Sequence, residues 1–182
     1  MKPLYEETLQ EAYIYHGRII NLRNDTVRLE NGSTASREVI EHSGGVCVVA
    51  IDDENRIYMV RQYRYPYKEV LLEIPAGKLT PGEKPTDCGK RELEEETGLS
   101  ANELVSLGQL YPTPGYVGEI LYMYLAQGLR QKQQHLDEDE FLEVVKVPFD
   151  EALGMVLHGE IKDAKTQAAI MKVRLLKDAG EL

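Results

Sequence analysis

The chain has few of the residues that build disulfide frameworks and soft-metal sites. Cys47 and Cys88 are its only cysteines, and its four histidines are scattered without ligand spacing. A disulfide-stapled secreted scaffold needs more cysteines, and a zinc knuckle needs paired ligands. No run of 18 apolar residues occurs, and residues 1–10 contain no apolar stretch typical of a secretory leader. We therefore expect reduced cysteines and a soluble, cytoplasmic protein.

Basic residues are also scarce relative to acidic ones. The chain has 21 lysines and arginines against 31 aspartates and glutamates, which gives a formal net charge of -10. Phosphate backbones and anionic lipid surfaces repel such a chain. We expect neither a nucleic acid nor a membrane as a partner, and an anionic substrate would need a metal ion and local arginines.

The length of 182 residues suits one hydrophobic core. Asn31-Gly32 is the strongest local hairpin signal, and runs 46–51 and 56–65 look like a central hairpin. Apolar spacing predicts helices over residues 150–158 and 162–177. Apolar and alternating runs predict strands over residues 11–21, 25–30, 36–42, 46–51, 56–65, 70–74, 104–111, 119–126 and 144–147. The sum is an α+β fold, a mixed sheet with helices packed on it.

One further helix is expected between the loop at residues 80–82 and Gly98. Pro85 fits the first turn of this helix, and Asp87 complements its positive end. Gly98 can adopt the left-handed conformation that ends a helix.

Three glutamates of this helix share one face. At 100° per residue, Glu92, Glu95 and Glu96 lie within an arc of about 100°, whereas Glu94 points away. Their mutual repulsion disappears when a divalent cation lies between them, and oxygen ligands favour Mg²⁺ or Mn²⁺ over zinc. The alternative is a solvated acidic helix without a ligand.

The segment 77–99 resembles the Nudix box, Gly-x5-Glu-x7-Arg-Glu-U-x-Glu-Glu-x-Gly-U, in which U is a bulky aliphatic residue. Every fixed position matches, at Gly77, Glu83, Arg91, Glu92, Leu93, Glu95, Glu96, Gly98 and Leu99. The solvated-helix alternative does not explain Gly77 and Glu83 at their fixed distances. The resemblance implies hydrolysis of a nucleoside diphosphate linked to another moiety. It also implies an α/β/α sandwich with a mixed central sheet and an N-terminal antiparallel β subdomain.

Segments outside the box are similar to those of bacterial ADP-ribose pyrophosphatases. They are GRIINL, SREVIEH, VRQYRYP, LEIPAGKL, YPTPGYVGE, LDEDEFLEV and DAKT, and together they extend from about residue 17 to residue 166. This resemblance implies Mg²⁺-dependent hydrolysis of ADP-ribose to AMP and ribose 5-phosphate, with Mn²⁺ able to substitute. Two alternatives stay open: hydrolysis of another nucleoside diphosphate sugar or dinucleotide, and a catalytically silent sensor of ADP-ribose.

The resemblance also implies a set of metal-binding and catalytic residues. Glu92 and Glu96 are expected to act in both roles, and Glu138 in the acidic segment 136–140 is expected to be the general base. The implied metal ligands are the carbonyl of Ala76 and the side chains of Glu92, Glu95, Glu96 and Glu140. A run of acidic residues in a loop is often only solvated, and whether Glu138 or Glu140 is the base stays open.

Substrate-binding residues are implied by the same resemblance. Arg37 and Arg64 correspond to substrate-contacting arginines, and an arginine fork matches phosphate geometry without losing its charge. Pro114 lies where the subfamily has a Ser-Pro-Gly motif, here with Thr113 in place of serine, and Glu119 follows that loop. Surface ion pairs are the alternative explanation for both arginines.

The expected division of the chain is an N-terminal β segment over residues 1–42 and a Nudix catalytic domain over residues 43–182. Related proteins form homodimers in which the N-terminal strands of one subunit pack across the other. The resemblance therefore implies a homodimer with a small nucleotide as substrate.

Overall fold

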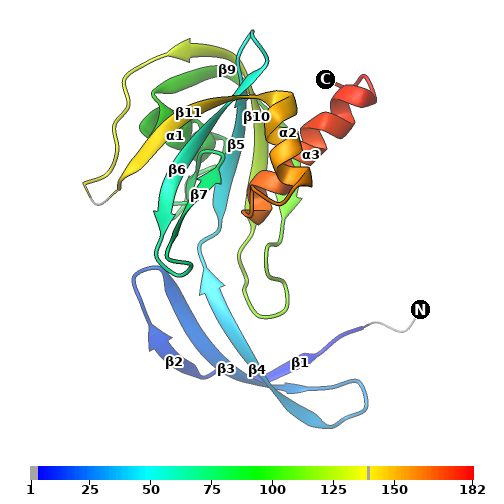
Figure 1. The fold of residues 1–182 in the computed structure, drawn as a ribbon. Helices are drawn as coiled ribbons and strands as arrows, with labels where there is room; N and C mark the ends of the chain where they lie inside the picture. Colours follow the sequence, from blue (N-terminus) through cyan, green and yellow to red (C-terminus); the bar gives the residue numbers. More distant parts are fainter. Residues whose placement is uncertain (1–3, 139) are drawn as a thin grey trace. The chain divides into compact units, whose positions relative to one another are not determined.

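The computed structural model describes residues 4–138 and 140–182, and the chain forms two compact units (Figure 1). The N-terminal unit comprises Met1–Gly44 with Tyr111–Ile120, and the core unit comprises Gly45–Leu110 with Leu121–Leu182. Segment 111–120 thus belongs with the N-terminal strands, which the sequence did not indicate. The division at residues 42 and 43 stays a prediction.

The N-terminal unit is built on one antiparallel sheet. Its strands are β1 (Glu7–Gln10), β2 (Tyr13–His16), β3 (Ile20–Arg28) and β4 (Thr34–His42). The long strand β3 pairs with β1 and β2 along one edge and with β4 along the other. The Asn31-Gly32 hairpin is confirmed between β3 and β4, and Gly32 has a φ of 83°. The strand expected over 11–21 is interrupted, because the Gly17 N–H donates to the Ile20 carbonyl and closes a turn.

The loop at residues 111–120 is attached to β4 within this unit. The Ile40 N–H donates to the Tyr116 carbonyl at 2.8 Å, and the Gly118 N–H donates to the Ile40 carbonyl at 2.9 Å. These two bonds tie the loop that carries Pro114 and Glu119 to β4 near its C-terminal end.

The core unit is built on a mixed sheet of seven strands. They are β5 (Gly45–Ile51), β6 (Arg56–Arg64), β7 (Glu69–Glu73), β8 (Ala76–Lys78), β9 (Leu99–Leu110), β10 (Leu121–Gln131) and β11 (Leu142–Pro148). The order is β11-β6-β5-β10-β9, with β7 on β6 and β8 on β5, and only β5 and β10 run parallel. The expected central hairpin is short: β5 and β6 pair at only two positions, because β8 pairs with the first half of β5.

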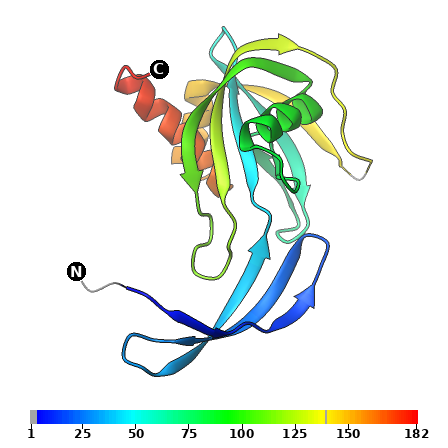
Figure 2. The ribbon, with the colours of Figure 1, turned by 180° about the vertical axis from the view of Figure 1, so that it is seen from behind.

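Three helices cover the two faces of this sheet, as the opposite views in Figures 1 and 2 show. They are α1 (Pro85–Thr97), α2 (Phe149–Leu157) and α3 (Ala164–Asp178). Successive side chains of β5 alternate between the faces. Val46 and Val48 pack with Leu93 of α1, whereas Val49 packs with Phe149 of α2 and with residues of α3. The α/β/α sandwich expected from the sequence is confirmed.

Helix α1 has the expected ends. Pro85 is its first residue, and Gly98 follows it in the left-handed conformation with φ of 66° and its N–H donating to the Glu94 carbonyl. Strand β9 then begins at Leu99, five residues earlier than expected. In the described part of the chain, no helix is long and apolar enough to cross a membrane.

Candidate active site

Arg91 organises the acidic residues of the box from inside helix α1. Its Nε donates to Glu83 at 2.9 Å, and its Nη1 donates to Glu92 at 2.7 Å and to Glu95 at 2.8 Å. Its Nη2 donates a hydrogen bond to the Lys78 carbonyl at 3.2 Å. The hydrogen bond from Arg91 lowers the pKa of Glu83 to about 2. One guanidinium therefore holds three carboxylates, as expected for a residue that orients ligands.

Glu96 is the most deeply buried carboxylate of the box, with 2% of its surface exposed. Its Oε2 accepts a hydrogen bond from the Ala76 N–H at 3.2 Å. Burial, and then the charge of Glu140, raise its pKa well above the ordinary range. Burial also raises the pKa of Glu92, and the charges of Glu95 and Glu140 add to that increase. Negative charge is therefore concentrated here in a place that water reaches poorly.

Gly77 makes room for Glu92. A Cβ atom on this residue would lie 1.8 Å from Cδ of Glu92 and 2.0 Å from its Oε1. Strand β8 therefore passes so close to the carboxylate that no other residue fits without moving it. This contact explains why a glycine stands at the start of the box.

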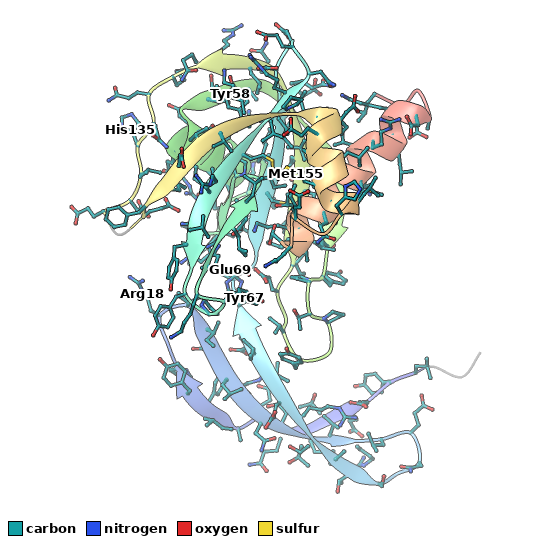
Figure 3. The ribbon with its side chains drawn as sticks, viewed as in Figure 1. Arg18, Tyr58, Tyr67, Glu69, His135 and Met155 are labelled. Atoms are coloured by element: carbon teal, nitrogen blue, oxygen red, sulfur yellow. The ribbon has the colours of Figure 1, made fainter. Side chains whose placement is uncertain are left out.

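The loop after β10 brings Glu140 toward these residues. Lys132 N–H donates to the Gly98 carbonyl at 2.7 Å, and His135 N–H donates to the Glu95 carbonyl at 3.0 Å, so the loop follows the end of α1 (Figure 3). Further on, Glu140 Oε1 accepts from Gln62 Nε2 of β6 at 3.3 Å, and burial raises the Glu140 pKa. Glu138 lies exposed in the same loop.

Arg64 of β6 lies beside this cluster. Its Nε and Nη2 form a bidentate pair with Glu73, at 2.6 Å and 2.7 Å. The hydrogen bond with Glu73 raises the Arg64 pKa, and the charge of Glu96 adds to this increase; the charge of Arg64 in turn partly offsets the raised pKa of Glu140. The structure thus brings Arg64 together with the expected metal ligands Ala76, Glu92, Glu95, Glu96 and Glu140.

The remaining predicted residues lie in the N-terminal unit. Arg37 of β4 pairs with Glu6, with Nε 2.8 Å from Oε2, so it is engaged in a surface ion pair within this structure. Glu119 Oε1 lies 3.4 Å from Nδ1 of His42, and Pro114 is exposed at the tip of the loop. The substrate roles of these three residues stay predictions.

Reasoning from the sequence missed three contacts of this site. Gln62 anchors Glu140, Glu73 holds Arg64, and Lys165 of α3 contacts Glu73. The segments VRQYRYP, LEIPAGKL and DAKT contain these residues, so the signal was present, but their pairing needs the tertiary fold.

The donor atoms at this site fit Mg²⁺. In the regions that the structure describes, no three acidic, histidine or cysteine side chains form a ready metal-binding group. Mg²⁺ needs only one or two protein carboxylates, because water and substrate phosphate complete its coordination. The candidate ligands are the carboxylates of Glu92 and Glu96 and the carbonyl of Ala76, all of which offer oxygen atoms. Burial raises the pKa of both carboxyl groups, so a nearby cation would favour their charged forms.

A test follows from the raised pKa of Glu96. The folded protein binds a proton on Glu96 more tightly than the unfolded chain does. Protonation of Glu96 therefore stabilises the fold below the pKa of the unfolded chain, and this contribution is lost as the pH rises through the pKa of the folded protein. In EDTA, Glu96→Gln should therefore unfold at least about 2 °C above wild type at pH 8, with a smaller gap at pH 5. Mg²⁺ should raise the melting temperature of the wild type more than that of the variant. If the difference in melting temperature between Glu96→Gln and wild type is the same at pH 5 and pH 8, Glu96 does not have a raised pKa.

The chain matches two family models that together extend over most of its length. The NUDIX domain model matches residues 41–170, and the nucleoside diphosphate sugar hydrolase N-terminal domain model matches residues 6–40. The ADP-ribose pyrophosphatase of Bacillus subtilis (strain 168) is 43% identical over 177 residues, which cover 96% of each chain. The methanol dehydrogenase activator of Bacillus methanolicus is also 43% identical, over 178 residues and 96% of each chain.

A solved structure supports the family match. The crystal structure of an ADP compounds hydrolase superposes with a TM-score of 0.86 and 25% identity, and the match covers all of both chains. The fold, the complete box and the extent of the family match lead to one conclusion: this chain belongs to the Nudix family and is a Nudix hydrolase.

Proposed function

We propose that this Nudix hydrolase cleaves the diphosphate of ADP-ribose to give AMP and ribose 5-phosphate, with Mg²⁺ as the cofactor and Mn²⁺ as a substitute. The observation that carries the proposal is the pair of carboxylates formed by the half-buried Glu92 and the buried Glu96, held against β8 by Arg91 and the Ala76 N–H. ADP-ribose is favoured as the substrate because a relative with 43% identity over 96% of the chain is an ADP-ribose pyrophosphatase.

Each residue of the site has a distinct task in this proposal. Glu92, Glu96 and the Ala76 carbonyl would hold Mg²⁺, with Glu95 and Glu140 as further ligands. Bound there, Mg²⁺ neutralises charge on the diphosphate oxygens. Arg91 keeps two of these carboxylates in a fixed orientation through its two bonds from Nη1.

The remaining steps are proton transfer and substrate binding. Glu138, on an exposed loop, takes a proton from the attacking water as a new bond from oxygen to phosphorus forms. The bond between that phosphorus and the bridging oxygen then breaks. Arg64 donates to a phosphate oxygen, and Arg37, Pro114 and Glu119 are proposed to contact the rest of the nucleotide.

A homodimer through the N-terminal sheet is part of the proposal. Large apolar side chains are exposed along this sheet, among them Leu9, Tyr13, Ile14, Tyr15 and Ile19. A surface of this kind favours a second protein as its partner.

A substrate panel tests the choice of nucleotide. With Mg²⁺ present, kcat/KM for ADP-ribose should exceed that for ADP-glucose, GDP-mannose, NADH and diadenosine polyphosphates by about tenfold or more. Product analysis should give AMP and ribose 5-phosphate in equal amounts. If another nucleotide is preferred, the metal-binding residues keep their roles, but the substrate contacts must be reassigned.

A further inference from the structure

A network of buried charges lies where α3 begins, next to the candidate active site. Glu73, the last residue of β7, is 1% exposed, and the Lys165 side chain is 12% exposed. Charged side chains are almost never buried this deeply unless they are paired. Taking such charges out of water carries a desolvation cost, and a contact that served only to join two elements could be made by apolar side chains without this cost.

The network alternates in charge across four residues. Lys165 Nζ contacts Oε2 of Glu73, and it lies 3.0 Å from Oδ1 of Asp163. The same Glu73 carboxylate accepts both bonds from Arg64. Asp163 caps α3 by accepting from the Thr166 N–H at 2.9 Å. The helix therefore fixes Lys165, Lys165 fixes Glu73, and Glu73 fixes Arg64.

Arg64 is held in a way that leaves one end of its fork available. Its Nε and Nη2 bind Glu73, whereas its Nη1 makes no hydrogen bond with any described residue. The side chain is 38% exposed, so an anion from solution can reach it. An arginine restrained at two nitrogens loses little entropy when it binds a phosphate through the third.

Simple anchoring of α3 does not explain the network. Thr166 Oγ1 already accepts from the Ile74 N–H at 3.0 Å, which joins α3 to the residue after β7. Lys162, outside α3, contacts Glu69 at the other end of β7 at 2.8 Å. Apolar side chains of similar volume would join these elements at equal or lower cost.

We propose that Lys165 and Glu73 are positioning residues that hold Arg64 with Nη1 free to bind a phosphate of the substrate diphosphate. The inference rests on the proposed function in one respect, the role of Arg64 as a phosphate-binding residue. Without Lys165, Oε2 of Glu73 keeps only its contact with Arg64, and the whole charge of the carboxylate acts on Arg64. Arg64 then attracts a second anion less strongly.

The first comparison is between Lys165→Met and Lys162→Met. Both remove an ammonium group that contacts a glutamate of β7, but only Lys165 reaches the glutamate that holds Arg64. Lys165→Met should raise KM for ADP-ribose about tenfold and lower kcat less than about threefold. It should weaken binding of the α,β-methylene analogue of ADP-ribose, measured by calorimetry with Mg²⁺, by a similar factor. Lys162→Met should leave KM, kcat and this affinity near wild type.

A double-mutant cycle with Arg64→Ala separates the possible outcomes. If Lys165 acts through Arg64, Lys165→Met should add little to the KM of Arg64→Ala. An equal further increase would overturn the inference, because Lys165 would then act elsewhere. If Arg64→Ala raises KM but Lys165→Met behaves like Lys162→Met, the inference alone fails. If Arg64→Ala leaves KM and analogue affinity unchanged, the phosphate-binding role of Arg64 in the proposed function fails, and the inference fails with it.

A second variant covers the case in which Lys165→Met does not fold. Lys165→Gln keeps an N–H donor for Glu73 and removes only the charge. It should fold and raise KM about threefold or more, again without adding to the effect of Arg64→Ala. A KM equal to wild type in folded Lys165→Gln, with Arg64→Ala clearly impaired, would contradict the positioning role.

Discussion

Glu96→Gln should lower kcat for ADP-ribose by about a thousandfold, with the fold intact. The variant keeps an oxygen that can accept the hydrogen bond from Ala76 N–H, so the packing of α1 against β8 is retained. It removes the charge of the most buried carboxylate in the box. A loss of about 4 kcal/mol in metal binding and charge stabilisation corresponds to this factor. Steady-state kinetics over a range of Mg²⁺ concentrations measure it.

Glu94→Gln is the matched control, since it makes the same change two residues earlier on the same helix. Two residues correspond to about 200° of rotation, so Glu94 lies on a different face. Its side chain has no hydrogen bond or ion pair with the described residues. Its kcat should stay within about twofold of wild type. Equal losses in the two variants would show that the face of α1 does not decide catalysis.

Gly77→Ala should lower kcat by about a hundredfold and change stability little. The new Cβ would lie 1.8 Å from Cδ of Glu92, so the carboxylate must move away from the site. The clash involves the far end of a flexible side chain, so the backbone can stay in place. A displacement of about 1 Å at a catalytic group can cost this factor in rate. Kinetics and thermal melting of the same preparation give both quantities.

Gly154→Ala supplies the control for the added methyl group. Gly154 lies within α2, and a Cβ there meets nothing within 4 Å. This variant should keep wild-type kcat and be equally or more stable, because alanine favours a helix. If Gly77→Ala also keeps wild-type kcat, Glu92 is not needed at its present position, and its assignment as a metal ligand is wrong.

Local signals predicted the helix of the box and most strands. Pro85 and Gly98 mark the two ends of α1 because their effect on the backbone is local. Strand β8 and the start of β9 at Leu99 were missed, since each depends on a partner distant in sequence. The parallel pairing of β5 with β10 likewise needs the tertiary fold, because more than 60 residues separate the strands.

The candidate site, too, could be predicted only in part from the sequence. Glu92, Glu95 and Glu96 could be grouped from helical spacing alone, and the resemblance added Ala76 and Glu140. Nothing in the sequence pairs Glu73 with Lys165, which are 92 positions apart. The packing of α3 against the end of β7 brings them together. Contacts of this kind decide how Arg64 is oriented, and the spacing of residues along the sequence does not predict them.

Hydrolysis of ADP-ribose by the wild-type protein, followed by phosphorus NMR as Mg²⁺ is added to an EDTA-treated sample, tests the account most directly. No turnover is expected without the metal. Turnover should rise with Mg²⁺, and AMP and ribose 5-phosphate should appear in equal amounts. Tight binding of ADP-ribose with no turnover in either Mg²⁺ or Mn²⁺ would contradict the account and indicate a sensor of the nucleotide.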